Sequence, residues 1–286
     1  MATILSGKAV AEALHQRLAR QMQTLAAAGV MPTLAILRVG ERSDDLAYER
    51  GAAKRCEKLG VAVRRVTLAA DCTQEELMSA IRAVNENAGI HGCLLLRPLP
   101  AGLDERAACE ALRPEKDVDC VTGASLARVF TGRGAGYPPC TAQACLEILD
   151  HYGCVLDGQR VTVVGRSLVI GKPAAMLLLA RNATVTVCHT HTMDLAAECR
   201  RADVLIAAAG KAGAIGPECV SRGQIIIDVG IHVTEDGGMC GDVDYPAVEP
   251  LAGAITPVPG GVGAVTSTVL AGHVIRAAAD AAGVAL

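Results

Sequence analysis

Residues 160–173, which read RVTVVGRSLVIGKP, constrain the fold of this chain more than any other stretch. The valines between 161 and 164 are β-branched, as expected of a strand that is buried on both faces. Gly165 ends this run, and Pro173 begins a segment rich in Ala, Leu and Met that favours a helix. A strand, a glycine-bearing turn and a helix place free N–H groups at a helix N-terminus, where phosphate binds. The spacing GRSxxxGxP alone leaves two interpretations open, a phosphate site or an ordinary tight turn of an α/β domain.

Strands and helices alternate around this stretch. The residue patterns predict strands at 34–39, 61–68, 93–96, 160–165, 184–188, 202–208, 224–229 and 254–255. They predict helices at 7–28, 44–59, 73–87, 141–151 and 265–282, with a capping box formed by Thr73 and Glu76. Residues 97–139 are expected to be irregular. The alternation indicates an α/β chain with parallel sheets, and helices fit between the first three pairs of strands that follow residue 160. That second half is therefore predicted to be a doubly wound, Rossmann-like nucleotide-binding domain.

Length and composition exclude several classes of protein. A chain of 286 residues suggests two domains, and 51% hydrophobic residues can build two cores. With only 2% aromatic residues and a net charge of −3, the chain has no signature of a nucleic-acid-binding protein. No apolar run is long enough to span a membrane, and no signal peptide is recognised, so we expect a cytoplasmic protein. The 12 cysteines include no C-x-x-C pair, so we expect reduced thiols and no metal site.

The residues near the expected phosphate turn favour NADP over NAD. NAD-type domains carry an acidic residue at the end of the second strand, where it binds the ribose 2′-hydroxyl. Here the strand ends in His189 to Thr192, which contains no carboxylate. Arg166 in the turn, together with the hydroxyls of Ser167 and Thr190, suits a 2′-phosphate. The two histidines of this segment are interpreted as polar loop residues without a catalytic role.

Ordered motifs extend over nearly the whole chain. They are ILSGK near the start, PEKDVD at 114–119, PCT at 139–141, VVGRSxxxGKP at the turn, ADVLIAAAGK at 202–211, IDVGI at 227–231, GDV at 241–243 and ITPVPGGVG at 255–263. In this order and spacing the sequence resembles the bifunctional methylenetetrahydrofolate dehydrogenase/methenyltetrahydrofolate cyclohydrolase family.

The resemblance implies a folate-binding catalytic domain at 1–139 plus 264–286, and an NADP-binding domain at 140–263. The last helix is expected to return to the first domain. The implied activity is the NADP-dependent oxidation of 5,10-methylenetetrahydrofolate to 5,10-methenyltetrahydrofolate, with hydrolysis to 10-formyltetrahydrofolate. Tetrahydrofolate one-carbon derivatives are the implied substrates, and a homodimer is the implied assembly.

Functional residues follow from the same resemblance. Tyr48 and Asp119 are the implied catalytic and substrate-binding residues. The segment that approaches folate is implied to be Pro259, Gly260, Gly261 and Val262, because glycines permit backbone contact with a flat ring. The implied cofactor-binding residues are Gly165, Arg166, Ser167, Gly171, Thr190 and Ile231.

The sequence departs from the family pattern in the first domain. The pattern SxxYxxxK falls on Asp45, Tyr48 and Ala52, so the catalytic Lys is absent. The family Gln before LPLP falls at Leu96, and the following Leu is Arg97. We expect these changes to impair hydrolysis more than hydride transfer, because only hydrolysis needs acid–base chemistry at a side chain.

Candidate replacements for the absent Lys lie on the same predicted helix. Asp44 and Asp45 lie one turn before the tyrosine, whereas Lys54 lies about 120° off its face. Arg55 lies on that face, but its guanidinium cannot act as a base. Two alternatives to the folate enzyme remain open, a related dehydrogenase for another small substrate and a non-enzymatic NADP- or folate-binding protein.

Overall fold

The computed structural model describes residues 2–286, which form two compact units. Unit A contains the chain up to Glu12 and Thr141–Thr266, and unit B contains Ala13–Cys140 and Ser267–Leu286. The sequence places the first residues in the folate-binding domain, but the structure groups them with unit A. The reason is a short strand, β1 (Thr3–Ile4), which pairs in parallel with β11 (Ala254–Ile255). The end of the last helix belongs to unit B, as expected.

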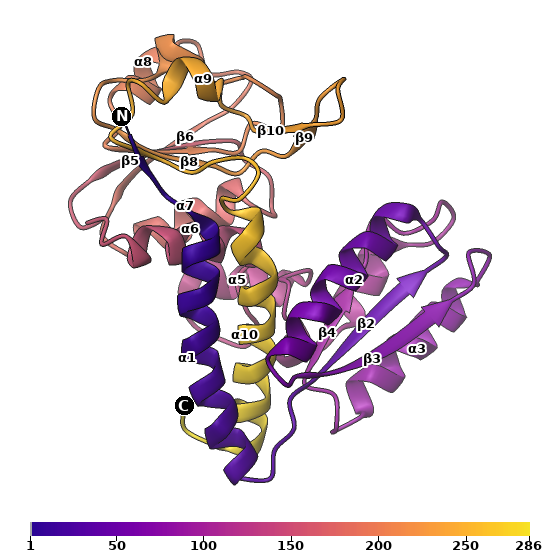
Figure 1. Ribbon diagram of the computed structural model, residues 1–286. Helices are drawn as coiled ribbons and strands as arrows, with labels where there is room; N and C mark the ends of the chain where they lie inside the picture. Colours follow the sequence, from indigo (N-terminus) through magenta and orange to yellow (C-terminus); the bar gives the residue numbers. More distant parts are fainter. Residues whose placement is uncertain (1) are drawn as a thin grey trace. The chain divides into compact units, whose positions relative to one another are not determined.

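Unit A is built on a six-stranded parallel sheet with the order β1-β11-β8-β7-β5-β6 (Figure 1). Its other strands are β5 (Arg160–Val164), β6 (Thr184–Cys188), β7 (Val204–Ala207) and β8 (Ile225–Asp228). The helices between and around them are α6 (Cys140–His151), α7 (Gly171–Leu179), α8 (Leu195–Arg200) and α9 (Tyr245–Val248). Because β5 lies between β6 and β7, the strand order reverses at β5, as in doubly wound domains.

One local prediction for unit A is wrong, and one small element was missed. The prediction of a helix between β7 and β8 fails because only a three-residue 3₁₀ turn, η2 (Pro217–Cys219), occurs there. The short antiparallel pair β9 (His232–Val233) and β10 (Met239–Cys240) was not predicted. Helix α7 begins at Gly171, so Pro173 is its third residue, where its missing N–H still leaves no bond unmade.

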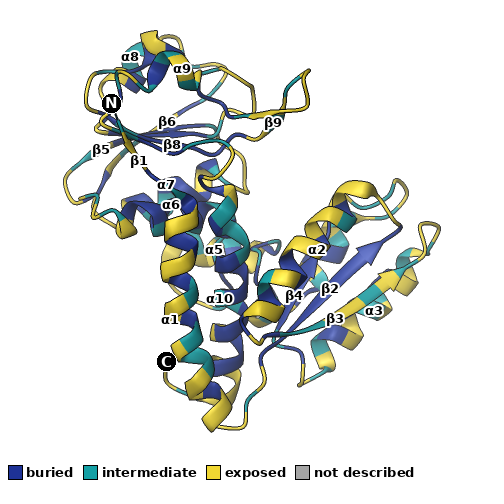
Figure 2. Cartoon of the chain, viewed as in Figure 1, coloured by how far each residue is buried: buried dark blue, intermediate teal, exposed yellow. Residues whose placement is uncertain are grey.

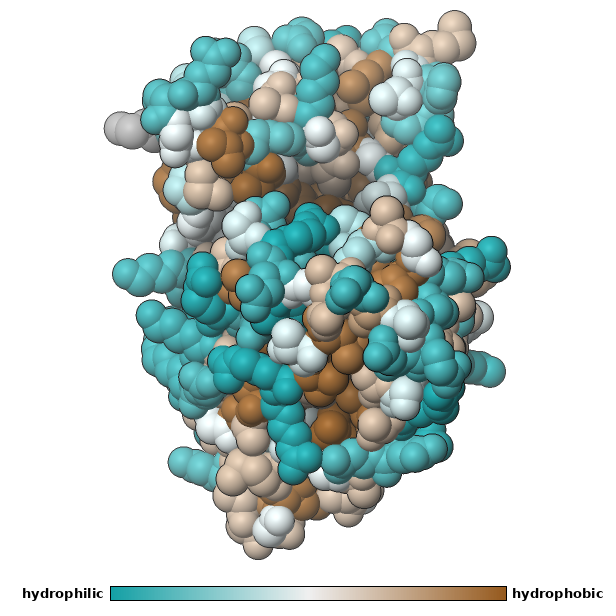
Figure 3. Space-filling view, turned by 90° about the vertical axis from the view of Figure 1, so that its right-hand side faces the viewer, coloured by the Kyte–Doolittle hydropathy of each residue, from teal (hydrophilic) through white to brown (hydrophobic). Residues whose placement is uncertain are grey.

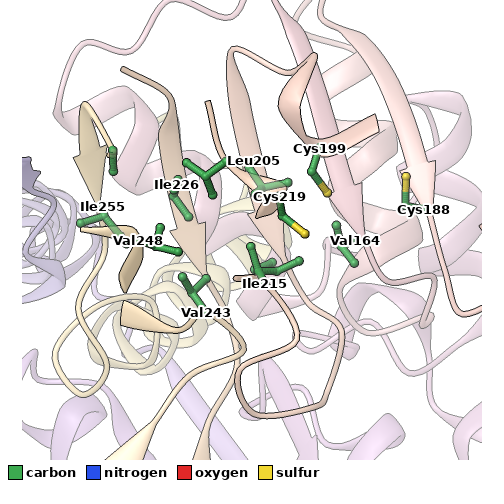
Figure 4. Packing of buried hydrophobic residues seen from close by; sticks show 13 residues of the cluster. Val164, Cys188, Cys199, Leu205, Ile215, Cys219, Ile226, Val243, Val248 and Ile255 are labelled. Carbon is green, nitrogen blue, oxygen red and sulfur yellow. The ribbon is translucent and has the colours of Figure 1, made fainter. Parts of the chain in front are cut away.

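The core of unit A consists of aliphatic side chains and cysteines. Figure 4 shows the cluster, in which Leu205, Ile226 and Ile255 from neighbouring strands pack with Ile215, Val243 and Val248. Its 13 buried members include no aromatic residue. Small branched side chains therefore fill the space beside the sheet, in agreement with the low aromatic content.

Unit B contains a three-stranded parallel sheet with the order β3-β2-β4. The strands are β2 (Thr33–Val39), β3 (Ala62–Leu68) and β4 (Gly92–Leu95), and the crossover helices are α2 (Ser43–Lys58) and α3 (Gln74–Glu86). All residues of the central strand β2 are buried, whereas the edge strand β3 is partly exposed (Figure 2). The capping box of α3 is confirmed, with Thr73 and Glu76 each bonded to the other's backbone N–H.

Helices α1 (Gly7–Ala27) and α10 (Gly263–Ala282) run side by side through most of their length in unit B (Figure 1). They approach closely at Gly272, where an added Cβ would lie 3.3 Å from a Leu18 methyl group. The expectation of irregular structure at 97–139 is only partly met. Helices α4 (Glu105–Ala111) and α5 (Gly123–Thr131) occur there, with the 3₁₀ turn η1 (Pro114–Lys116) between them. Asp104 and Thr122 cap the two helices.

The surface mixes hydrophilic and hydrophobic residues. On the face drawn in Figure 3, hydrophobic residues form separate patches with hydrophilic residues around them. None of the helices within residues 2–286 has the length and apolar character needed to cross a membrane.

Candidate functional site

A cavity of about 550 Å³ lies at the carboxyl ends of the strands of unit A. The segments that follow β5, β6, β7 and β8 all contribute to its walls, and β5 and β7 meet there at the point where strand order reverses. Ligands of doubly wound sheets bind at this position. Of the expected cofactor-binding residues, the cavity is lined by Gly165, Arg166, Ser167, Thr190 and Ile231.

The turn after β5 requires glycine at two positions. Gly165 has a φ of +128°, and a Cβ there would lie 2.0 Å from the carbonyl oxygen of Ala208. A Cβ on Gly171 would lie 2.1 Å from the carbonyl oxygen of Gly165. Gly171 therefore shapes the turn without lining the cavity. The Ser167 hydroxyl accepts a hydrogen bond from the Ile170 N–H at 3.1 Å, so its own proton is available to a ligand.

The charges around this cavity favour an anionic ligand. Arg166 is exposed, and its guanidinium has no partner among residues 2–286. Asp242 is the one carboxylate among the described residues that line the cavity, and it is fully engaged within the protein. It accepts hydrogen bonds from the N–H groups of Gly210 and Lys211, and it contacts His232 Nε2 at 2.7 Å. No free negative charge therefore opposes a phosphate at this end of the sheet.

A second buried carboxylate supports the first. Asp228 is 2% exposed, and it accepts hydrogen bonds from the N–H groups of Gly230, Asp242 and Val243. Burial raises its pKa to about 6, although the three N–H donors act in the opposite direction. A Cβ on Gly241 would lie 1.9 Å from an Asp228 oxygen, so the glycine is required for this packing. The motifs IDVGI and GDV thus meet in one network, a role that the sequence analysis did not predict.

The PGGVG segment forms a smaller cavity in unit A, of about 280 Å³. It is lined by the expected folate-approaching residues Pro259, Gly260, Gly261 and Val262. Gly230 and Ile231 line this cavity and the larger one, so the two are neighbours. The segment is packed too closely for larger residues, because a Cβ on Gly261 would lie 2.5 Å from the Pro257 carbonyl oxygen.

Unit B has its own cavity, of about 460 Å³, beside the carboxyl end of β4. The start of α2 and the chain after β4 line it, through Arg42, Asp44, Asp45, Tyr48, Leu94, Leu95, Leu96, Arg97 and Asp119. Tyr48 and Asp119, the two implied catalytic residues, thus line the same cavity. Tyr48 is 42% exposed, but burial around its hydroxyl and the nearby Asp119 carboxylate raise its pKa. Its hydroxyl therefore keeps its proton at neutral pH.

The two aspartates of the DVD motif have different roles. Asp117 is fully buried and accepts hydrogen bonds from the N–H groups of Val121 and Thr122 and from the Thr122 hydroxyl. It therefore fixes the start of α5. Asp119 is half-buried at the cavity, and burial raises its pKa to about 6, opposed by hydrogen bonding that its carboxylate accepts from Cys140 and by the charge of Arg97.

The residues that depart from the family pattern lie both inside and outside the unit B cavity. Ala52 is 2% exposed and does not reach the cavity, whereas Leu96 and Arg97 line it. Lys54 is exposed on α2 and does not line the cavity. Asp45 lines the cavity and is buried, whereas its neighbour Asp44 is exposed.

Comparison with known proteins agrees with this geometry. The tetrahydrofolate dehydrogenase/cyclohydrolase catalytic-domain model matches residues 5–119, and the NAD(P)-binding-domain model of the same family matches residues 139–282. The bifunctional protein FolD of Clostridioides difficile strain 630 is 48% identical over 274 residues, which cover 96% of each chain. FolD of Carboxydothermus hydrogenoformans is 47% identical over 97% of each chain.

Solved structures give the same result. The bifunctional FolD of Campylobacter jejuni superposes with a TM-score of 0.94 at 34% identity, covering 98% of this chain and 99% of that one. The FolD of Trypanosoma brucei, solved with NADP cofactor and an inhibitor, superposes with a TM-score of 0.89 at 33% identity over 98% of each chain. Since both family models and full-length relatives match, this chain belongs to the tetrahydrofolate dehydrogenase/cyclohydrolase family.

Proposed function

We propose that this protein oxidises 5,10-methylenetetrahydrofolate to 5,10-methenyltetrahydrofolate with NADP⁺, and that it then hydrolyses the methenyl compound to 10-formyltetrahydrofolate. The observation that carries the proposal is the lining of the unit A cavity in a chain of this family. At the point where the strand order reverses, the cavity offers Arg166 and hydroxyl donors and contains no free carboxylate. That donor set fits the 2′-phosphate of NADP. Bound NADP⁺ would supply the acceptor for the hydride.

The residues around the unit A cavity would hold the cofactor. The N–H groups of the turn between Gly165 and Gly171 suit the pyrophosphate, because they are free at the start of α7. Arg166, Ser167 and Thr190 would bind the ribose phosphate, and Ile231 would provide apolar contact. The PGGVG segment lies next to the same cavity, and it would contact the folate ring, not the cofactor, through Pro259–Val262.

The residues of the unit B cavity would hold the pterin. Asp119 would accept hydrogen bonds from the ring N–H and amino donors, which suits a carboxylate that otherwise lacks enough partners for its burial. Tyr48 would donate from its protonated hydroxyl. Hydride transfer requires no side chain to gain or lose a proton, so positioning and fixed charge are sufficient for this step.

The proposed domain boundaries differ from those that the resemblance implies at the start of the chain. We assign folate binding to unit B and NADP binding to unit A, with the N-terminal strand in unit A. We also infer a cytoplasmic homodimer that acts on tetrahydrofolate one-carbon derivatives and binds neither nucleic acid nor membrane. The family resemblance and the net charge of −3 support these inferences. Sedimentation velocity of the purified protein tests the dimer.

The activity is tested by following NADPH formation from methylenetetrahydrofolate with NADP⁺ and, separately, with NAD⁺. Loss of the methenyl absorbance is followed in a second assay without cofactor. We expect turnover in both assays and a higher kcat/KM with NADP⁺. Absence of NADPH formation with methylenetetrahydrofolate would contradict the proposed oxidation.

A further inference from the structure

Asp45 differs from the other buried carboxylates of this protein. It lies in the first turn of α2, it is 7% exposed, and it lines the unit B cavity. No hydrogen bond reaches its side chain from residues 2–286, and its nearest cation is Arg42, whose Nε lies 4.0 Å from Oδ2. Buried carboxylates normally have several donors, because removing the charge from water costs free energy. The Asp45 oxygens keep some exposure at the cavity, so the donors that the protein does not provide are expected to come from water or a ligand held there.

The other buried carboxylates are satisfied within the protein. Glu49 binds two arginine side chains, and Asp117, Asp228 and Asp242 each accept three or more contacts. The unmet hydrogen bonding at Asp45 is thus not a general feature of how this fold buries acidic groups.

Asp45 lies close enough to Tyr48 for both side chains to contact the same ligand. The two residues are three apart in α2, which places their Cβ atoms about 5–6 Å from each other on one face. Asp119 lines the same cavity from the chain after η1. A water molecule held by Asp45 would therefore share the cavity with a substrate held by Tyr48 and Asp119.

Other groups at the cavity are unsuited to accept a proton from water. Arg42 and Arg97 carry guanidinium groups, which stay protonated. Tyr48 keeps its own proton because its pKa is raised by burial and by Asp119. Asp119 is already used by the pterin under the proposed function. Asp44 is exposed to solvent, where its oxygen accepts a long contact of 3.4 Å from the Ser43 hydroxyl.

We propose that Asp45 is the general base of the hydrolytic reaction, a role that rests on the proposed function. In this step the water oxygen bonds to the bridging methenyl carbon, and one water proton passes to the Asp45 carboxylate. The cation is thereby converted to a neutral carbinolamine. The carbon–N5 bond then breaks as the hydroxyl becomes the formyl C=O, and N5 takes up a proton. The sum is methenyl cation plus water giving 10-formyltetrahydrofolate and one released proton, with no change in oxidation state.

The test measures the two reactions separately in full-length variants. Asp45→Asn retains the shape of the side chain but cannot accept the proton, so we expect kcat for hydrolysis of methenyltetrahydrofolate to fall about 100-fold or more. NADPH formation should stay within about threefold of wild type, because hydride transfer uses no base. Asp45→Glu should recover part of the hydrolysis. Glu57→Gln, an exposed change on the same helix, is the matched control and should alter neither reaction.

Three results would overturn the role of Asp45. One is hydrolysis at the wild-type rate in Asp45→Asn, and another is an equal loss of both reactions, which would make Asp45 a binding residue. The third is loss of hydrolysis in Asp44→Asn rather than in Asp45→Asn. In each case the wild-type protein would still oxidise methylenetetrahydrofolate, so the proposed oxidation would stand. A wild-type protein that oxidises methylenetetrahydrofolate but does not hydrolyse the methenyl compound would likewise refute the assignment of Asp45.

Discussion

Glu49 connects helix α2 to the sheet of unit B through a buried ion pair. Its carboxylate lies 2.9 Å from Arg38 Nε and 2.9 Å from Arg65 Nε. The side chains of Arg38 and Glu49 are 8% and 9% exposed, whereas that of Arg65 is 51% exposed. Arg38 also donates to the Gly40 carbonyl. Without Glu49, the Arg38 charge would remain in the interior with only a carbonyl group as its partner.

The size of the effect follows from these exposures. We expect Glu49→Gln to destabilise α2 by about 3–5 kcal/mol, because it breaks a buried pair and leaves one charge behind. Loss of the Arg65 contact should contribute at most about 1 kcal/mol, since solvent screens that pair. The double variant Arg38→Met with Glu49→Leu should lie within about 1 kcal/mol of wild type or be more stable, because both charges leave the interior together.

Native-state hydrogen exchange of the α2 amides measures this directly. A loss of 3 kcal/mol in the free energy of opening accelerates exchange by roughly 100-fold. Glu75→Gln is the control, because Glu75 lies 2.6 Å from Arg82 but the pair is 80% and 51% exposed, so its loss should cost less than about 1 kcal/mol. Equal effects of Glu49→Gln and Glu75→Gln would refute the argument from burial.

Three further predictions concern the candidate sites. Arg166→Ala should raise KM for NADP⁺ about 10-fold or more and leave KM for NAD⁺ nearly unchanged, because only NADP offers the 2′-phosphate; initial rates with both cofactors decide this. Gly165→Ala should abolish cofactor binding in calorimetry, since the new Cβ would lie 2.0 Å from the Ala208 carbonyl oxygen. Burial raises the pKa of Asp119 from 3.8 to about 6. Its protonated form therefore contributes fully to the free energy of unfolding below pH 3.8, and this contribution is lost as the pH rises through 6. Asp119→Asn should therefore raise the thermal midpoint at pH 8 more than at pH 5 while abolishing folate turnover.

Local signals in the sequence predicted much of the fold. The strand–turn–helix around Gly165 and the capping box of α3 depend on residues within a few positions of one another, and the structure contains both. Strand β1 could not be predicted this way, because its two residues gain their pairing from β11 at the far end of the sequence. Helices α4 and α5 are too short to show a clear period, and their capping residues Asp104 and Thr122 were not identified from the sequence.

The candidate sites were predictable to the same extent. The glycines and Arg166 of the cofactor turn lie within one motif, but its spacing also fits an ordinary tight turn, so the family resemblance was needed to propose them as cofactor-binding residues. The pairing of Asp228 with the backbone around Asp242 joins the end of β8 to a loop 14 residues later, and it depends on Gly230 and Gly241 leaving room for the carboxylates. The sequence displays these residues as motifs but does not indicate that they contact each other.

Buried carboxylates show why residue type alone does not distinguish a structural role from a catalytic or binding role. Asp117 and Asp119 stand two residues apart in one motif, yet Asp117 has three donors within the fold and Asp119 opens on a cavity with a raised pKa. Asp45 extends the contrast, because it is as buried as Glu49 on the same helix but lacks that residue's two close arginine partners. A carboxylate whose donors all come from the protein stabilises the fold, and its loss should weaken the structure. A carboxylate that lacks such donors and opens on a cavity is free to bind water or a ligand there, so its loss should affect turnover first.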